Sequence, residues 1–174
     1  MKNVIVKRAA AALLAAVFAL ICAGCARHKH IVVQSVWTDD FCFSVYEDGT
    51  ADVTAYVGSD ETLVIPDKVG KNTVIGFGTK AFDGCGTIKT VIIPPTVTSL
   101  PAKLFNNCPA LGSVYIPNTV TQIGKNVVYD CPEFGKVMYG GTEEEWELID
   151  VGSVPWTDNY SLVNAELICG YSID

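Results

Sequence analysis

Three cysteines, Cys85, Cys108 and Cys131, recur at a constant interval, since 108 − 85 and 131 − 108 both equal 23, and the residues around each one repeat with them. A repeated unit of this length cannot bury its apolar side alone, so neighbouring units must stack as coils and share one core. Each coil opens on a short apolar run that ends in Pro or Gly. These runs are Leu63–Pro66, Val91–Pro94, Val114–Pro117 and Val137–Gly140. The repeats therefore predict a solenoid of three coils and a fraction.

Several apolar columns recur downstream of each opening run. They are Val74/Val97/Val120, Phe77/Leu100/Ile123, Phe82/Phe105/Val128 and Ile88/Leu111/Phe134. A period of roughly 20 to 29 residues, with aliphatic residues at fixed places and a Cys or Asn column, is typical of leucine-rich repeats. We therefore expect a leucine-rich repeat solenoid over residues 63–140, mostly β with short helical or 3-10 segments. Phe82 and Phe105, with the three cysteines, should form its structural ladder.

The first coil is longer than the others. The interval from Pro66 to Pro94 is 94 − 66 = 28, whereas that from Pro94 to Pro117 is 117 − 94 = 23. The extra residues lie between Pro66 and Val74, and we expect them to form a surface loop that leaves the buried columns in register.

The N-terminal end of such an array needs a cap, and the sequence predicts a β-hairpin there. Two alternating runs, Phe41–Tyr46 and Ala51–Val57, flank an Asp-Gly pair at positions 48 and 49. Asp-Gly between such runs favours a tight hairpin turn, because the turn requires positive φ. We expect the N-terminal hairpin cap over residues 41–62.

The C-terminal end should be closed by a short helix. Thr142 followed by Glu145 is the pattern of a capping box, and glutamates near a helix start are favoured by the helix dipole. We expect a helix over residues 143–150, with Trp146 turned inward to close the core. The C-terminal cap should extend over residues 141–174, with a last strand near 165–169.

The first residues predict export. Basic residues precede the uncharged stretch Ala9–Ile21, and small residues follow at Ala23 and Gly24. This order is that of a secretory signal peptide. The apolar stretch is shorter than the roughly 20 residues that a membrane-spanning helix needs. We expect a signal peptide over residues 1–24 and an exported protein.

Cys25, directly after Ala23-Gly24, resembles the cysteine of the bacterial lipoprotein lipobox. In that family the cysteine carries diacylglycerol and becomes the first residue of the mature chain. Cys22 departs from the pattern, because leucine is usual at its place. The resemblance implies a lipid attachment at Cys25, stable anchoring in the membrane by two acyl chains and a tether over residues 25–40. The alternative is an ordinary secreted protein that is cut nearby.

The mature chain is acidic. Removal of residues 1–24 takes away three positive charges, which leaves 9 Lys and Arg against 19 Asp and Glu, a net charge of 9 − 19 = −10. A chain with this excess of negative charge repels phosphate backbones, so we expect no nucleic-acid partner.

Cys85, Cys108 and Cys131 occupy equivalent places, so their side chains should point inward in parallel, about one strand spacing apart. We interpret them as buried free thiols that fill a narrow column of the core. A disulfide between two adjacent members is the alternative. Cys42 and Cys169 fall in opposite caps, and such a separation makes a bridge between them geometrically difficult.

The coil sequence resembles that of the BspA-type leucine-rich repeat family of bacterial surface proteins. The family pattern joins an aliphatic-Ile-Pro strand to Val-Thr-x-Ile and then to Ala-Phe-x-x-Cys. The segments that match it are Ile93-Pro94, Val97–Leu100, Leu104–Cys108 and Ala81–Cys85, and Gly141–Trp146 is similar to the family's closing motif. Val127-Val128 departs from the usual Ala-Phe. The resemblance covers about residues 41–150 and implies a surface adhesion and protein-binding module without catalysis or cofactor.

One column of the strands should face outward. Residues alternate between the two faces of a strand, and the more uniformly aliphatic columns should face the core. The outward column is then Val64, Ile92, Tyr115 and Met138. An exposed row with an aromatic side chain and a Met is typical of a protein-binding surface. The alternative is that these residue types simply favour strands.

The residue types argue against an enzyme or a metal site. The histidines of the chain, His28 and His30, fall in the expected tether, where no packed wall would orient them for acid-base chemistry or metal binding. A cysteine nucleophile would need a base such as His beside it. Two hypotheses therefore remain: a lipid-anchored surface module that binds a host or neighbouring-cell protein, and a structural or assembly component of the cell envelope.

Overall fold

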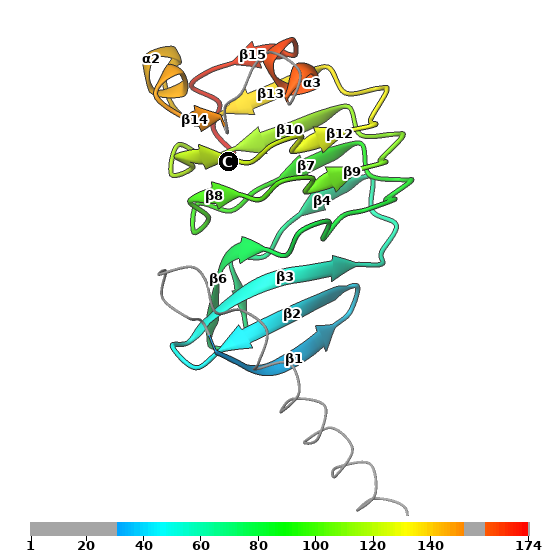
Figure 1. Ribbon diagram of the computed structural model, residues 1–174, viewed down its shortest axis with the longest axis vertical. Helices are drawn as coiled ribbons and strands as arrows, with labels where there is room; N and C mark the ends of the chain where they lie inside the picture. Colours follow the sequence, from blue (N-terminus) through cyan, green and yellow to red (C-terminus); the bar gives the residue numbers. More distant parts are fainter. Residues whose placement is uncertain (1–30, 152–158, 174) are drawn as a thin grey trace, which may run out of the picture.

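The computed structural model describes residues 31–151 and 159–173, and it confirms the expected leucine-rich repeat solenoid. Coils stack one on another along the long axis of the molecule, from β1 at one end to α2, α3 and β15 at the other (Figure 1). The strands are β1 (Val32–Thr38), β2 (Phe41–Tyr46), β3 (Thr50–Tyr56), β4 (Thr62–Val64), β5 (Lys68–Val69), β6 (Asn72–Phe77), β7 (Thr90–Ile92), β8 (Ser99–Leu100), β9 (Phe105–Asn106), β10 (Ser113–Ile116), β11 (Gln122–Ile123), β12 (Val128–Tyr129), β13 (Lys136–Tyr139), β14 (Asp150–Val151) and β15 (Glu166–Ile168). The helices of the described residues are α2 (Glu143–Glu147) and α3 (Tyr160–Val163).

Each coil contributes its opening run to one parallel sheet, which we call the main sheet. Its strand order is β15-β13-β10-β7-β4. The register aligns equivalent residues of successive coils, so Leu63 pairs with Val91, Val91 with Val114, and Val114 with Val137. The repeat columns of the sequence are therefore physical columns in the molecule.

Shorter strands form the other sides of each coil. A three-stranded sheet has the order β14-β11-β8, and a two-stranded sheet pairs β12 with β9. The side chains that point inward from all sides fill a single core, and nearly all the predicted column residues are buried there. Phe134 and Cys85 are the exceptions, because they are only partly buried and pack against the edge of this core.

Tight corners recur at the same places in each coil. Lys80, Lys103 and Asn126 have φ of 62°, 56° and 52°, and they recur at the interval of the cysteines. A second set, Gly84, Asn107 and Asp130, has φ of 74°, 55° and 54° at the same interval. Asn, Asp and Gly accept this left-handed conformation more readily than other residues, which explains the residue types of the second set.

The N-terminal cap is larger than the expected hairpin. β2 and β3 pair antiparallel across the turn at Gly49, whose φ is 82°, as predicted. However, β1 pairs antiparallel with β2, so residues 32–38 of the expected tether are a folded strand. The chain reverses at Asp39, whose φ is 45°, and this turn brings residues 32–38 back along β2. The expected signal peptide, the lipid attachment at Cys25 and the start of the tether lie outside the described residues.

The extra residues of the first coil form a second hairpin rather than a loop. β5 and β6 pair antiparallel around Gly70, whose φ is 60°. β6 also pairs in parallel with β3, so the hairpin joins the cap sheet, whose order is β1-β2-β3-β6-β5. The insertion therefore connects the cap to the first coil.

The C-terminal cap has the predicted helix start. Thr142 accepts a hydrogen bond from the backbone N–H of Glu145, and Glu145 accepts one from the N–H of Thr142, which completes the capping box. The helix ends at Glu147 rather than at residue 150, because Asp150 begins β14 beside β11. The partly buried Trp146 packs edge-on against the buried Tyr139, with ring centroids 5.2 Å apart.

Asn159, just before α3, closes the top of the third coil with its side chain. Its Oδ1 accepts a hydrogen bond from the backbone N–H of Val127 at 3.0 Å, and its Nδ2 donates to the backbone O of Gly124 at 3.1 Å. In the coil below, backbone N–H groups donate directly to the next coil, as from Phe105 to the O of Val127. The amide side chain of Asn159 thus provides hydrogen-bond partners to the backbone of the third coil, on the side opposite the second coil.

Candidate binding groove on the main sheet

The structure places the four residues of the predicted outward column in one row on the main sheet. Val64 pairs with Ile92, Ile92 with Tyr115, and Tyr115 with Met138. Ile168 of β15 extends the row beyond Met138. Val64 is 60% exposed, whereas the side chains of the other three are half-buried. The row therefore faces outward, but part of it is covered.

The cover is the segment Gly170–Ile173, which we call the C-terminal segment. Its backbone is fixed at two points: Gly170 N–H donates to the O of Gly141 at 2.7 Å, and Tyr171 N–H donates to the O of Tyr139 at 3.0 Å. The ring of Tyr171 lies against the ring of Tyr115, with centroids 6.0 Å apart. These contacts hold the segment beside the strand column.

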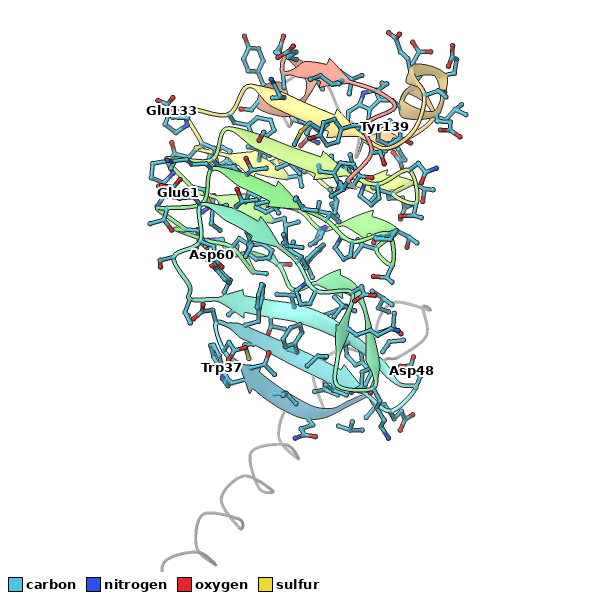
Figure 2. All side chains as sticks on the ribbon, turned by 180° about the vertical axis from the view of Figure 1, so that it is seen from behind. Trp37, Asp48, Asp60, Glu61, Glu133 and Tyr139 are labelled. Carbon is cyan, nitrogen blue, oxygen red and sulfur yellow. The ribbon has the colours of Figure 1, made fainter. Side chains whose placement is uncertain are left out.

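A groove of about 600 Å³ lies between this segment and the main sheet. Its residues come from the strand ends, the prolines that follow them and the C-terminal segment. They are Val64, Ile65, Pro66, Asp67, Ile92, Ile93, Pro94, Pro95, Tyr115, Gly140, Gly170, Tyr171, Ser172 and Ile173. Val64, Ile92 and Tyr115 thus line the groove, while Met138 is not among its lining residues. Figure 2, which is turned by 180° from Figure 1, shows the strands of the main sheet, with Tyr139 of β13 labelled near the C-terminal cap.

The polar groups at the groove are few. Burial raises the pKa of the Tyr115 hydroxyl, so this group stays neutral at physiological pH and can donate or accept a hydrogen bond. Asp67 provides a carboxylate among the lining residues. Polar side chains at the starts of the strands bond to one another instead of facing the groove. The hydroxyls of the paired residues Thr90 and Ser113, for example, share a hydrogen bond of 2.9 Å. The groove is therefore an apolar trough with a few polar groups, as binding sites commonly are.

The cysteine column lies inside the coils, away from this groove. Cys85, Cys108 and Cys131 are free thiols, and the last two are buried while Cys85 is half-buried. The Sγ of Cys108 donates a hydrogen bond to the backbone O of Phe82 at 2.9 Å, and that of Cys131 donates to the O of Phe105 at 3.7 Å. Each buried thiol thus satisfies a carbonyl of the coil below, which is a structural role.

Hydrogen bonds between the thiols also shift their pKa values. A hydrogen bond from Cys108 lowers the pKa of Cys85. The hydrogen bond from Cys131 lowers the pKa of Cys108, but the hydrogen bond to Cys85 and burial outweigh it and raise that pKa to about 11. The hydrogen bond to Cys108 and burial raise the pKa of Cys131. The two buried thiols therefore stay protonated at neutral pH.

A second hollow of about 400 Å³ lies between the cap sheet and the first coils. Asp52, Ile75, Gly76, Phe77, Thr96, Thr98, Ser99 and Pro101 line it. The carboxylate of Asp52 accepts a hydrogen bond from the Tyr46 hydroxyl at 2.7 Å. Burial, followed by this contact with Asp52, raises the pKa of Tyr46. The acidic group in this hollow is therefore already bonded to a neighbouring side chain.

Within residues 31–151 and 159–173, no group of three His, Cys, Asp or Glu side chains is arranged to hold a metal ion. The helices of these same ranges are too short to cross a membrane. The sequence analysis missed the C-terminal segment. Gly170 is a weak sequence signal for a turn, because glycine readily accepts a positive φ. In the structure its φ is 67°, and the chain turns back over the sheet there.

Residues 61–145 match the model of the BspA type Leucine rich repeat region (6 copies). A comparison with curated proteins found no match. Among solved structures, the chain is similar to a leucine-rich repeat protein from Bacteroides capillosus ATCC 29799. The TM-score is 0.62 at 20% identity, and the match covers 76% of this chain and 97% of that protein.

It is also similar to a leucine rich cell surface protein from Faecalibacterium prausnitzii A2-165, with a TM-score of 0.53 and 24% identity. That match covers 62% of this chain and 33% of the other protein, so the chain spans about a third of the length of this relative. Both likenesses show the fold. Residues 61–145 are therefore similar to BspA-type leucine-rich repeats, and the chain folds as a leucine-rich repeat solenoid.

Proposed function

We propose that this protein is a lipid-anchored bacterial cell-surface module that binds another protein through the groove on its main sheet. The observation that carries the proposal is the groove itself, in which Val64, Ile92 and Tyr115 lie in register beside Tyr171. Tyrosine is enriched at protein interfaces, because its ring buries apolar area and its hydroxyl forms hydrogen bonds. The volume of about 600 Å³ suits side chains of a partner protein.

A binding role agrees with the solenoid architecture. Stacked coils present a regular, extended surface that partners of many solenoid proteins use. The main sheet offers such a surface, and the C-terminal segment forms one wall of the groove through its contact with Tyr115. Since the relative from Faecalibacterium prausnitzii is a cell surface protein, a surface location is a reasonable inference for this chain as well.

The anchor is the second part of the proposal. The stretch Ala9–Ile21 followed by Ala23, Gly24 and Cys25 supports export and lipid attachment at Cys25. Replacement of Cys25 by Ala tests it: the parent protein should partition into the detergent phase after export, and Cys25→Ala should move to the aqueous phase. Retention of Cys25→Ala in the detergent phase would contradict the lipid anchor.

The module acts without catalysis in this proposal. The buried thiols Cys108 and Cys131 stay protonated and are bonded to backbone carbonyls, so they lack the thiolate character of a nucleophile. The carboxylate of Asp52 is bonded to Tyr46 rather than directed at a reactive group. A surface that recognises a partner is the role that these residues support.

Binding can be tested with full-length protein in detergent on immobilised collagen, laminin and fibronectin, together with a set of cell-surface proteins. The groove variant is Tyr115→Ser/Tyr171→Ser, which removes both rings of one wall contact. The matched control is Leu148→Ser/Tyr160→Ser, because these residues are 84% and 68% exposed and do not line the groove.

Saturable binding that is lost in the groove variant and retained in the control variant would support the groove as the binding site. Equal binding by both variants would place the contact elsewhere on the molecule. Absence of binding to every member of the panel would favour the alternative role as an assembly component of the cell envelope. Circular dichroism of both variants checks that the solenoid remains folded.

A further inference from the structure

The first cysteine of the column differs from the two that follow it. The thiols of Cys108 and Cys131 donate hydrogen bonds to the backbone O of Phe82 and Phe105, each in the preceding coil. Cys85 belongs to the first coil, which follows the cap sheet along the axis of the molecule (Figure 1). Among the described residues its thiol has no carbonyl acceptor of this kind, and its side chain is only half-buried. Cys85 is therefore the accessible end of a column of three thiols.

Backbone hydrogen bonds align the first coil with the second. The N–H of Phe82 donates to the O of Leu104 at 3.3 Å. The N–H of Gly84 donates to the O of Asn106 at 2.9 Å. The register is that of β9 and β12 in the next two coils, since 105 − 82 and 128 − 105 both equal 23. The first two cysteines thus lie side by side, about 4.8 Å apart between their backbones, and a disulfide spans roughly 4.4 to 6.8 Å between Cα atoms.

The two thiols are also in contact, and this contact favours the thiolate of Cys85. The hydrogen bond from Cys108 lowers the pKa of Cys85. The thiolate is the form that attacks a disulfide, and a lowered pKa with partial exposure is typical of a reactive cysteine. Cys42 and Cys169 are half-buried as well, but they lie in the two caps, outside the column. Only the half-buried Cys85 therefore has a second thiol of the column beside it.

We propose that Cys85 and Cys108 form a dithiol–disulfide pair, which an external disulfide oxidises to a covalent bond between the first and second coils. The Cys85 thiolate attacks one sulfur of that disulfide, which forms a mixed disulfide on Cys85 and releases one thiolate. The Cys108 thiolate then attacks the Cys85 sulfur, closes the bond between the two cysteines and releases the second thiolate. The pair loses two electrons and two protons, and the external disulfide is reduced to two thiols.

The order of the two steps follows from the way each thiol affects the protonation of the next. The hydrogen bond from Cys131 lowers the pKa of Cys108, but the hydrogen bond to Cys85, burial and the charge of the Cys85 thiolate raise it to about 11. A mixed disulfide on Cys85 carries neither a thiol proton nor a charge, so it removes two of the causes that raise this pKa. The hydrogen bond from Cys131 remains and stabilises the Cys108 thiolate. Reaction at Cys85 therefore prepares Cys108 for the second step.

The other adjacent pair of the column is closed to an external disulfide. Cys108 and Cys131 are 1% and 6% exposed, and both stay protonated in the reduced protein. A disulfide donor that approaches from solvent therefore meets Cys85 first. Disulfides form mainly outside the cytosol, so the export that we propose would bring the pair to such donors. The inference goes beyond the binding groove, because none of these cysteines lines it.

Peptide mapping of the unmodified sequence gives the first test. Reduced full-length protein in detergent is treated with oxidised glutathione at about pH 8, and the remaining thiols are blocked with N-ethylmaleimide. Trypsin then places the three cysteines of the column on separate peptides, residues 81–89, 104–125 and 126–136. The proposal predicts a disulfide that joins the first two peptides, whereas Cys42 and Cys169 should carry glutathione or remain free. Circular dichroism before and after oxidation checks that the solenoid stays folded.

Two variants separate the steps. Cys108→Ala lacks the second thiol, so Cys85 should retain glutathione and the joined peptides should be lost. Cys131→Ala is the matched control, because it removes the other buried thiol of the column and leaves the proposed pair in place. The joined peptides should persist in this control.

The proposal is wrong if the parent protein keeps glutathione alone on Cys85, if Cys85 remains free, or if the second and third peptides are joined instead. Loss of the joined peptides in a folded Cys131→Ala variant would also contradict it. The result for the parent protein does not depend on the folding of either variant. Binding to the groove is measured separately with Tyr115→Ser/Tyr171→Ser, so a failure of one inference leaves the other intact.

Discussion

The ring of Phe82 stacks on the ring of Phe105 in the next coil, with centroids 5.4 Å apart and an interplanar angle of 24°. Both rings are fully buried. Phe77 and Tyr56 contact Phe82 from the cap side, at 5.8 and 6.2 Å between ring centroids. The third coil has Val128 at the equivalent position, so the aromatic stack ends there. This stack connects the N-terminal cap to the repeats.

Phe105→Ala should destabilise the protein by about 3 to 5 kcal/mol, because it opens a cavity and removes the ring on which Phe82 stacks. Urea unfolding of the parent and the variant measures the free-energy difference. The control is Tyr129→Ala, in the neighbouring strand β12, where the side chain is 50% exposed. A loss below about 1 kcal/mol at Phe105 would contradict its place in the core ladder.

The sequence predicts the repeated part of the molecule well, because a column that recurs at the repeat interval reports a position in every coil. The burial of Phe82, Phe105, Cys108 and Cys131 and the outward row from Val64 to Met138 both follow from that period. The caps do not repeat, so each of their contacts is supported by a single local pattern. The capping box at Thr142 was such a pattern and was sufficient to place the start of α2.

The missed features depend on contacts between distant segments. The hydrogen bond from Gly170 to Gly141 joins two residues that are far apart in the sequence, and no local pattern requires it. The groove wall at Tyr171 therefore could not be predicted, although the strand column beneath it could. For β1, the two aspartates at positions 39 and 40 were a usable turn signal. The segment of β1 was expected to belong to the tether because it lies close in sequence to Cys25.

Asn159→Ala should lower the free energy of unfolding by about 1 to 3 kcal/mol. The substitution leaves the buried backbone N–H of Val127 without its acceptor and removes the donor to the Gly124 carbonyl. Thermal unfolding measures the change. The control is Asn164→Ala, which removes a hydrogen bond to Tyr160 that is exposed to solvent. Equal small losses at both positions would contradict the capping role of Asn159.

The pKa of Cys108 predicts how stability changes at alkaline pH. The folded value is about 11, whereas an unfolded cysteine titrates at about 8.5. The thiol therefore loses its proton in the unfolded state first, so its contribution to stability is complete below about pH 8.5 and is lost as the pH rises to about 11. The parent protein should become less stable over this interval.

Cys108→Ala should flatten this alkaline loss, because it removes the thiol with the raised pKa and the hydrogen bond that raises the pKa of Cys131. Urea unfolding at pH 7.5 and at pH 10 gives the two differences. Cys42→Ala is the control, because Cys42 is a partly buried free cysteine of the N-terminal cap that lies outside the cysteine column. If the parent and Cys108→Ala lose the same stability between these pH values, Cys108 does not carry the effect.

Asn107 tests the corner that repeats in every coil. Its φ of 55° is left-handed, its side chain is exposed, and its backbone N–H donates to the O of Tyr129 at 2.9 Å. A β-branched residue resists this conformation, so Asn107→Val should cost about 1 to 2 kcal/mol, while Asn107→Gly should remain within about 0.5 kcal/mol of the parent protein.

Both variants retain the backbone hydrogen bond and remove the same exposed amide. The difference between them therefore reports the cost of the left-handed conformation, reduced by the larger entropy that glycine loses on folding. Chemical unfolding of the two variants and the parent gives the values. Asn118→Val provides the matched control, because Asn118 is exposed and its φ is not positive. A cost at Asn118 as large as that at Asn107 would show that the loss of the amide, and not the left-handed corner, determines the stability of the coil.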